Sequence, residues 1–321
     1  MNEDVMISIA MATFNGEKYL REQIDSILAQ THQNFELVIC DDCSTDGTAG
    51  ILREYEAQDS RIHVYVNERN LGFKKNFERA ISLCKGEYIA LSDQDDIWLP
   101  EHLETLYNTI RQKSSLLACG NSCLVDFGGC DLGKNTNDLG GFYELRYLAK
   151  PELKIFFAGN FFCGHDMLMV SSFAHRFLPV PEQIPVHDIW FALCAALENV
   201  FAYTFEVITK FRQHQKSATI THRQRQRRSL FAAWRSKCRV LIKGSVTNRF
   251  EYCDALDNYF DASNERYDEV RKIIRNIQYR HLTFSDIRFL WKNYQFIAGR
   301  KGHRLFFKRL IIWSRWKSEC K

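Results

Sequence analysis

Ser92-Asp93-Gln94-Asp95-Asp96-Ile97-Trp98 is the stretch from which the fold of this chain can be inferred. It follows Glu87-Tyr88-Ile89-Ala90-Leu91, an aromatic and β-branched run that predicts a buried strand. Three carboxylates therefore stand where a strand ends, and like charges this close repel unless a cation or hydrogen-bond donors offset them. Mg²⁺ or Mn²⁺ is the simplest such cation, because it accepts one or two carboxylates and also binds a substrate's phosphates. An acidic turn that caps the next helix is the alternative for an isolated Asp-x-Asp.

The segments before this stretch alternate between strand and helix patterns. Short apolar runs predict strands, and apolar residues at helical spacing predict helices between them. The predicted strands are 6–12, 35–40, 62–66 and 87–91, and the predicted helices are 17–30, 48–57 and 75–84. This βαβαβαβ series predicts an α/β fold with a Rossmann-like, mostly parallel sheet and helices on both faces.

Polar segments follow all four predicted strands. They are Thr13-Phe14-Asn15-Gly16, Asp41-Asp42, the loop 67–72 and Asp93-Gln94-Asp95-Asp96. Ligands of a parallel α/β sheet bind beyond the carboxyl ends of its strands, so these segments are expected to converge on one edge. A single Asp-x-Asp is a weak signal, whereas several acidic or glycine-containing loops on one edge predict a nucleotide-binding site.

These segments resemble the motifs of the inverting family 2 glycosyltransferases, which have the GT-A fold. The matching motifs are Ala12-Thr13-Phe14-Asn15-Gly16, Asp41-Asp42-x-Ser44-x-Asp46-x-Thr48, Asn67-x-x-Asn70-x-Gly72 with Asn76, and the stretch 92–98. The resemblance covers about residues 5–220. It implies a nucleotide-diphospho-sugar transferase fold, a nucleoside-diphosphate sugar as donor, and Mn²⁺ or Mg²⁺ as cofactor. Gln94 between the acids, followed by Asp96 and Trp98, resembles the rhamnosyltransferase-like branch.

The resemblance also implies roles for individual residues. The expected donor-binding residues are Thr13, Asn15, Asp41, Asp42, Asn70, Gly72, Asn76, Asp93 and Arg212. The expected metal ligands are Asp95 and His214, and Arg212 would offset charge on the leaving diphosphate. His165, Asp166, His187 and Trp190 are expected on the acceptor side. A local turn is the alternative for His165 and Asp166.

Asp188 is the expected general base. It opens a helix predicted over 190–197, where free backbone N–H groups stabilise a carboxylate. An inverting transfer needs a base, because the acceptor hydroxyl loses its proton as it attacks the anomeric carbon. His187-Asp188-x-Trp190 resembles a variant of the family's acidic motif. A plain helix N-cap is the alternative for Asp188.

The middle of the chain is less regular. The runs 116–125 and 202–208 predict further strands. The Gly-rich segment 128–141 is expected to be too flexible to pack, either as a surface loop or as a lid.

Composition narrows the class of protein. The chain has 321 residues, of which 45% are hydrophobic, enough for one large core or a medium core with an appendage. No apolar run approaches the roughly 18 residues of a membrane span, and the acidic start Met1-Asn2-Glu3-Asp4 is unlike a signal peptide. Eleven cysteines without framework spacing favour a reducing compartment, and Cys40-x-x-Cys43 lacks the second pair of a zinc site. These features predict a cytoplasmic protein.

Charge is divided unevenly along the chain. Residues 221–321 hold 24 Lys and Arg against 9 Asp and Glu, a surplus of 15, whereas residues 1–220 hold 19 against 30. We therefore predict a catalytic domain over 1–220 and a C-terminal basic helical extension over 221–321. The pattern at 229–243 predicts a basic amphipathic helix, and 300–317 mixes tryptophan with cations. Such segments suit the anionic inner face of the plasma membrane, with packing on the catalytic domain as the alternative.

The predicted function is sugar transfer to a growing, lipid-linked surface polysaccharide, with no nucleic-acid partner. A sugar-phosphate nucleotidyltransferase is one alternative, but it needs a Gly-rich phosphate loop with arginine after the first strand, and 13–16 is not such a loop. A non-enzymatic membrane or nucleic-acid adaptor is the other. It would leave the acidic loops unused, and these would repel phosphate without a metal.

Overall fold

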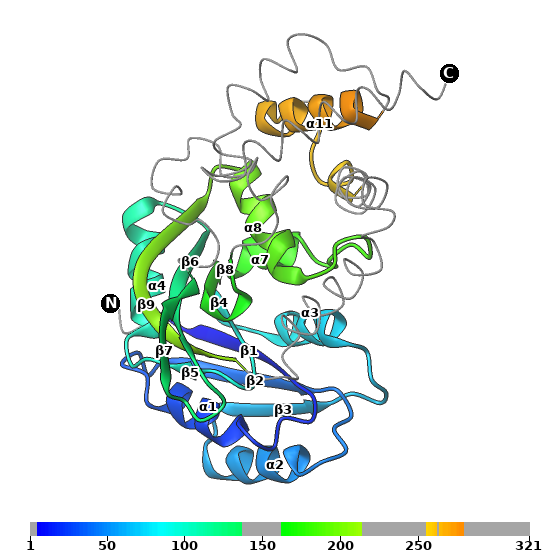
Figure 1. Cartoon of the computed structure of the whole chain (residues 1–321). Coiled ribbons are helices and arrows are strands. Elements are labelled where there is room, and N and C mark those ends of the chain that lie inside the picture. The colour runs from blue at the N-terminus through cyan, green and yellow to red at the C-terminus, as the bar shows by residue number, and fades with distance from the viewer. Residues whose placement is uncertain (1–4, 137–161, 214–254, 262, 279–321) are drawn as a thin grey trace, which may run out of the picture. The chain divides into compact units, whose positions relative to one another are not determined.

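The structure is a computed structural model that describes residues 5–136, 162–213, 255–261 and 263–278 (Figure 1). The chain divides into two compact units, residues 1–140 with 160–213 and residues 141–159 with 214–321. The described part of the first unit contains one nine-stranded sheet with its helices, and that of the second contains α11 (Glu265–Gln278).

The first half of the sheet is parallel. Its elements are β1 (Ile7–Thr13), α1 (Leu20–Leu28), β2 (Phe35–Asp41), α2 (Thr48–Gln58), β3 (Ile62–Val66), α3 (Phe73–Leu83) and β4 (Tyr88–Ser92). The strand order is β3-β2-β1-β4, and α3 lies on the opposite side of the sheet from α1 and α2 (Figure 1). Every residue of β2 is buried, as expected for a strand covered on both faces, which explains its nearly continuous apolar sequence. The predicted βαβαβαβ series is confirmed.

The second half of the sheet is mixed. Its elements are β5 (Ile97–Trp98), α4 (His102–Lys113), β6 (Leu117–Val125), β7 (Asp131–Asn135), the 3₁₀ helix η2 (Gly164–Asp166), β8 (Met167–Val170), α7 (Ser171–Arg176), α8 (His187–Leu197) and β9 (Phe201–Arg212). The order continues β4-β8-β6-β9-β5, with β8 antiparallel to both β4 and β6. The residues 93–96 between β4 and β5 form the acidic loop. The long strand β9 curves along β6, and its end pairs with β5, directly after this loop (Figure 1).

One expectation about this half was wrong. The segment 128–141 was predicted to be too flexible to pack, but residues 131–135 form β7, which pairs antiparallel with β6. Glycine and asparagine lower strand propensity, and here the edge of β6 offers backbone partners that outweigh this preference. Four of the five β7 residues are exposed, so no apolar pattern marked the strand in the sequence.

The predicted C-terminal helix over 229–243 and the closing run 300–317 lie outside the described residues. Within the residues that the structure describes, we find no helix with the length and apolar character needed to cross a bilayer.

Candidate active site

Asp42 shapes the loop between β3 and α3. Its Oδ1 accepts hydrogen bonds from Asn67 Nδ2 and from the Leu71 N–H, both at 2.7 Å, and its Oδ2 accepts from the Gly72 N–H at 2.8 Å. Asn70 Nδ2 donates to the Asp42 carbonyl at 3.1 Å. The Asp42 side chain is buried. Asp42, Asn70 and Gly72 thus meet at one edge, where Asp42 fixes the loop conformation.

Thr13, Asp41 and Asn76 tie neighbouring strand ends together. Thr13 Oγ1 donates to Asp41 Oδ1 at 2.9 Å, and Ser44 donates to the same carboxylate through its N–H at 3.0 Å and its hydroxyl at 2.6 Å. Asn76 donates to the Cys40 carbonyl at 2.7 Å. All three residues were predicted to bind the nucleotide-sugar donor. Their side chains are buried, and they stabilise the ends of the strands at this edge of the sheet.

Asn15 and Gln94 connect the loops across this edge. Asn15 Oδ1 accepts from the Thr45 N–H at 2.8 Å. The Gln94 amide makes two hydrogen bonds with the Phe14 backbone, accepting from its N–H at 2.8 Å and donating to its carbonyl at 3.0 Å. A Cβ on Gly16 would lie 2.3 Å from Gln94 Oε1, so a side chain there would displace the Gln94 amide from the Phe14 backbone. Gln94 therefore clips the acidic loop to the loop after β1.

The acidic loop presents one carboxylate outward and one inward. The Asp93 side chain is 43% exposed, whereas that of Asp96 is 1% exposed. His165 Nδ1 lies 3.4 Å from Asp93 Oδ2 and 3.1 Å from Asp96 Oδ2. Asp96 Oδ1 accepts from the Arg212 N–H at 2.9 Å. Asp96 Oδ2 makes the ion-pair contact with His165 but has no hydrogen bond among the described residues.

His165 is a buried histidine surrounded by acids. Its Nε2 lies 3.0 Å from Ser122 Oγ and 3.5 Å from Asp166 Oδ2, and Ser122 Oγ donates to Asp166. Burial favours the neutral ring, but Asp96 and Asp166 outweigh it and raise the pKa of His165 well above its usual range. His165 and Asp166 were predicted on the acceptor side. The structure places them behind the acidic loop, 3% and 1% exposed.

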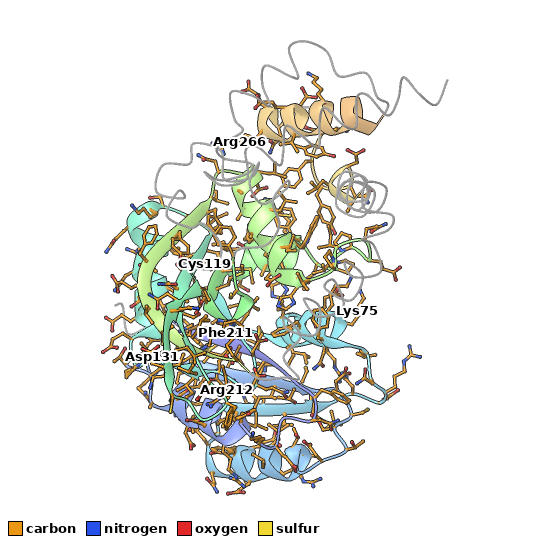
Figure 2. The ribbon with its side chains drawn as sticks, viewed as in Figure 1. Lys75, Cys119, Asp131, Phe211, Arg212 and Arg266 are labelled. Atoms are coloured by element: carbon orange, nitrogen blue, oxygen red, sulfur yellow. The ribbon has the colours of Figure 1, made fainter. Side chains whose placement is uncertain are left out.

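Arg212 ends β9 and braces the acidic loop from the other side (Figure 2). Its Nε donates to the Asp95 carbonyl at 2.9 Å, its Nη1 to the Phe127 carbonyl at 3.1 Å, and its Nη2 to Glu22 Oε2 at 2.5 Å. The side chain is 2% exposed. Arg212 was predicted to meet the leaving diphosphate, and in this conformation its guanidinium is engaged by three internal partners.

Asp188 lies in the first turn of α8. The helix begins at His187, with Val186 at the N-cap and no side-chain cap hydrogen bond there, so the alternative of Asp188 as N-cap is wrong. Asp188 Oδ1 accepts from the Ile189 N–H at 2.6 Å. A carboxylate in the first turn is stabilised by the helix dipole. Its role as a base stays a prediction.

His187 is buried beside Asp188, and among the described residues its ring makes no hydrogen bond. Its side chain is 6% exposed, its ring packs against Phe77 with centroids 4.1 Å apart, and neither ring nitrogen has a partner among the described residues. Burial lowers the pKa of His187 to about 4, with Asp93 opposing the shift, so the ring is neutral near pH 7. Trp190, the other predicted acceptor residue in α8, is fully buried and donates from Nε1 to the Phe177 carbonyl at 2.7 Å. Trp190 therefore packs the helix and cannot touch an acceptor in this conformation.

The 3₁₀ helix η2 lies between the acidic loop and the start of α8. A Cβ on Gly164 would lie 3.1 Å from His187 Nε2 and 3.6 Å from Asp188 Cβ, so the η2 backbone passes directly beside the start of α8. The next residue, His165, contacts Asp93. Two consecutive residues thus bring the acidic loop and the predicted base together. Of the two predicted metal ligands, Asp95 is partly buried and is not among the clustered ligand atoms of Asp93, Asp96 and His165, and His214 lies outside the described residues.

Residues 8–176 match the sequence profile of Glycosyl transferase family 2, more than half of the 321 residues. The chain belongs to glycosyl transferase family 2. An uncharacterized glycosyltransferase of Methanocaldococcus jannaschii is 32% identical over 213 residues, which is 64% of this chain and 70% of that protein. A putative teichuronic acid biosynthesis glycosyltransferase of Bacillus subtilis is 34% identical over 129 residues, 40% of this chain and 51% of the relative. The match to this relative thus spans about half of its length.

Solved structures of similar fold support the GT-A architecture. TarS of S. aureus, residues 1-349 in complex with UDP-GlcNAc, aligns with a TM-score of 0.53 at 17% identity over 90% of this chain and 91% of that 1-349 chain. A mannosyltransferase of Pyrobaculum calidifontis in complex with GDP-Man and Mn²⁺ aligns with a TM-score of 0.54 at 15% identity over 92% of this chain and 85% of that enzyme. At these identities the likeness concerns the fold alone. The predicted family and the GT-A fold are confirmed, and the rhamnosyltransferase-like branch stays a prediction.

The acidic loop of this family 2 chain has the chemistry of a divalent-cation site. Asp93, Asp96 and His165 offer ligand atoms within 4.8 Å of one another, and Cys163, His165 and Asp166 form a second such group. The first group contains the buried Asp96 Oδ2, which contacts His165 but accepts no hydrogen bond among the described residues, so a cation could bind this oxygen as well. Burial raises the pKa of the Cys163 thiol, which disfavours the second group as a ligand set. Asp96 and Asp166 raise the pKa of His165, which disfavours the neutral ring that binds a metal, so the carboxylates of the loop are the better ligands for Mg²⁺ or Mn²⁺.

Several residues that build the site were missed by the sequence predictions. Ser122 reaches His165 across 43 positions of the chain, and Glu22 reaches Arg212 across 190. Neither residue belongs to a motif, and no periodicity marks it. Gln94 was noted only as a marker of the rhamnosyltransferase-like branch, although it makes the two hydrogen bonds to the Phe14 backbone.

Proposed function

We propose that this chain transfers a sugar from a nucleoside-diphosphate sugar to a hydroxyl group of a glycan, with inversion at the anomeric carbon. One observation carries the proposal. The η2 helix places Gly164 against Asp188 while His165 contacts Asp93, so a half-exposed acid on the nucleotide edge and a helix-start carboxylate flank the same turn. Membership of glycosyl transferase family 2 gives the reaction class, glycosyl transfer, in which these two carboxylates would act.

Asp188 is the proposed base. Its carboxylate takes the proton of the acceptor hydroxyl as the hydroxyl oxygen bonds to the anomeric carbon, and the bond to the diphosphate breaks on the opposite face. The Ile189 N–H holds Asp188 Oδ1 in a fixed orientation during this step. His187 stays a predicted acceptor residue. Its ring is neutral near pH 7, and both ring nitrogens are buried without a partner among the described residues, so they do not reach an acceptor hydroxyl in this conformation.

Asp95 and Asp93 are the residues proposed to hold Mn²⁺ or Mg²⁺, Asp95 on the family resemblance alone. Asp96 is the alternative ligand, and unlike Asp95 it belongs to the group whose ligand atoms lie within 4.8 Å of one another. Such an ion supplies positive charge that stabilises the leaving diphosphate. Arg212 and Gln94 keep the acidic loop in place, because they hold the Asp95 carbonyl and the Phe14 backbone. His165 and Asp166 support the loop from behind. The donor residues Thr13, Asn15, Asp41, Asp42, Asn70, Gly72 and Asn76 form the nucleotide edge.

The sugar and the acceptor are the finer part of the proposal. Relatives support a polysaccharide or lipid-linked acceptor, since one from Escherichia coli, 34% identical over 124 residues, is named a UDP-Glc:alpha-D-GlcNAc-diphosphoundecaprenol beta-1,3-glucosyltransferase. Rhamnose was predicted from Gln94 and Trp98. Gln94 binds the Phe14 backbone, and Trp98 is 2% exposed and stacks on His102 at 3.8 Å, so neither contacts a donor sugar in this conformation.

A screen of nucleotide sugars tests the function. The full chain is incubated with each donor, deoxythymidine-diphosphate rhamnose first, and release of nucleoside diphosphate is measured with Mn²⁺, with Mg²⁺ and with a chelator. We expect release from one donor, dependent on the divalent cation and increased by a lipid-linked saccharide acceptor. No release from any donor under all three conditions would contradict the proposal.

The basic extension is proposed to bring the enzyme to anionic lipid. Its surplus of 15 positive charges supports this, because each basic residue near such a surface contributes about 1 kcal/mol. Sedimentation of the full chain with phosphatidylglycerol vesicles should decrease as salt is raised, and neutral vesicles should not sediment it. Equal sedimentation with both lipids would contradict the membrane role.

A further inference from the structure

Lys74 is a cation in an unfavourable local position. It is the second residue of α3, whose first turn contains no acidic residue. A positive charge near a helix N-terminus opposes the helix dipole. Burial lowers the pKa of the Lys74 ammonium, a second cost of placing it there. Lys74 thus opposes the helix dipole and also has a partly buried charge. A residue with two such costs is expected to make favourable contacts elsewhere in the fold.

The compensation is a set of three backbone carbonyls from a distant segment. Lys74 Nζ donates to the carbonyls of Pro181 at 3.1 Å, Glu182 at 3.2 Å and Ile184 at 2.9 Å. An ammonium group has three N–H donors, so all of them are used. The same segment is turned on itself by a hydrogen bond from the Ile184 N–H to the Pro181 carbonyl at 3.0 Å. Three carbonyl oxygens that point at one centre repel each other unless a cation occupies that centre.

This turn leads directly into α8. Ile184 is fully buried, and α8 begins three residues later at His187, with Asp188 next. A second contact joins the same two helices, because Phe77 of α3 packs against the His187 ring. On its other side, α3 follows the loop that Asp42 holds through the Leu71 and Gly72 N–H groups. Helix α3 therefore connects the loop 67–72, which Asp42 holds, with the start of α8.

We propose that Lys74 is a positioning residue, which holds the 181–184 turn and thereby sets the place of Asp188 relative to the nucleotide edge. The proposal rests on the proposed function for the role of Asp188, but the hold on the turn is a property of the fold. It predicts that loss of the ammonium frees the turn while the nucleotide edge keeps its own hydrogen bonds.

Hydrogen exchange on the full chain without ligand tests the hold itself. In Lys74→Met, backbone amides of 182–190 should exchange about tenfold faster than in the wild type, because hydrogen bonds to a charged group are lost. Lys74→Arg keeps the charge and should give an intermediate rate. Arg176→Met is the matched control, since Arg176 grips Glu198 at the opposite end of α8. Unchanged exchange over 182–190 in Lys74→Met would overturn the proposal, whatever the enzyme activity.

Enzyme kinetics test whether the contact between Lys74 and the turn 181–184 positions Asp188 for catalysis. With the donor found by the screen, Lys74→Met should lower kcat about tenfold and leave the KM for the donor within about twofold, because Asp188 acts only in the chemical step. In an Asp188→Asn background the same substitution should have no further effect on kcat, since Lys74 acts through Asp188. Equal losses in both backgrounds would overturn the positioning role. If no donor is turned over, the proposed function fails and the exchange experiment still decides the hold.

Discussion

The nucleotide edge and the start of α8 are built in opposite ways. On the edge, Asp42 accepts three hydrogen bonds and Gln94 makes two, so the polar side chains are satisfied by the protein itself. At the start of α8, both nitrogens of the buried His187 lack partners among the described residues. Buried polar groups are rarely left unpaired, so the first region is organised before a ligand arrives and the second is not. This contrast suggests a preformed donor side and an acceptor side that a substrate completes.

Removal of the proposed base should give the largest effect. Asp188→Asn keeps the size of the side chain but cannot take a proton, so we expect sugar transfer to fall by about 10² to 10⁴. Because Asp188 is not the N-cap, the melting temperature should change little. Calorimetry of nucleoside-diphosphate binding checks that the nucleotide edge is intact.

Glu198→Gln is the matched control for this variant, since Glu198 is the C-cap residue of the same helix and pairs with Arg176 on the surface. It should transfer sugar at close to the wild-type rate. If Asp188→Asn did so as well, the base assignment and the alignment of His187-Asp188 with the family motif would both be withdrawn.

Loss of a metal ligand should give the next largest effect. Asp95→Ala should weaken Mn²⁺-dependent binding of nucleoside diphosphate by about 100-fold, because even outer-shell partners of a metal cost about 10- to 100-fold. Titration calorimetry with and without Mn²⁺ measures the difference. Asp96→Asn sharpens the assignment, since Asp96 belongs to the ligand group formed with Asp93 and His165. A larger loss in Asp96→Asn than in Asp95→Ala, with both variants folded, would move the metal to the inner carboxylate.

The parallel half of the fold could be predicted from the sequence because its signals are local. Strands such as Phe35–Asp41 are short, apolar and separated by helical patterns, and the acids that follow them mark the edge. The strand β7 could not be predicted, because its pairing energy comes from β6 and its own residues are mostly exposed. Local pattern therefore identified the buried strands of the parallel half and missed β7, which buries little apolar surface. The helix α4 was missed as well, although Leu103, Leu106 and Ile110 on it are buried.

The candidate site was predicted as a set of positions but not as a set of contacts. Motif spacing brought Asp42 and Asp93 to one edge, as the structure has them. It could not show that Trp190 is inside the core, because the indole N–H is satisfied by Phe177, which no motif includes. Nor could it separate Asp93, which is half-exposed, from Asp96, which is buried against His165. Exposure and partner choice depend on residues far apart in the chain.

A change on the preformed side should cost stability. In Asp42→Asn one carboxylate oxygen becomes an amide, which faces donors such as the Gly72 N–H instead of accepting from them. Hydrogen bonds to charged groups contribute about 1.5 to 3 kcal/mol, so the free energy of unfolding should fall by about 2 to 3 kcal/mol. Asp59→Asn is the control, because Asp59 pairs with Arg61 nearer the surface and such a pair contributes about 1 kcal/mol or less. Equal losses in urea unfolding of the two variants would contradict the special role of the Asp42 contacts.

The start of α8 should respond to pH through His187, and this is the smallest effect. An unfolded histidine has a pKa of about 6.5, whereas burial lowers the pKa of His187 to about 4 in the folded chain. Between these values the unfolded state binds more protons, so this residue makes the folded chain less stable as pH falls from about 6.5 toward 4. His102, whose pKa burial lowers to about 3, acts in the same direction, and His165 acts in the opposite one.

His187→Phe isolates the contribution of this one ring, because His102 and His165 are unchanged. Between pH 7.5 and pH 5.5 the wild type should lose about 1.4 kcal/mol more unfolding free energy than the variant, the value for a group that titrates only when unfolded. Urea unfolding at the two pH values measures it. Phenylalanine also fills the site against Phe77 without leaving ring nitrogens unpaired, so the variant should be at least as stable as the wild type at pH 7.5. A pH response equal to that of the wild type would mean that His187 already has a partner in solution, and the contrast between the two sides of the site would then fail.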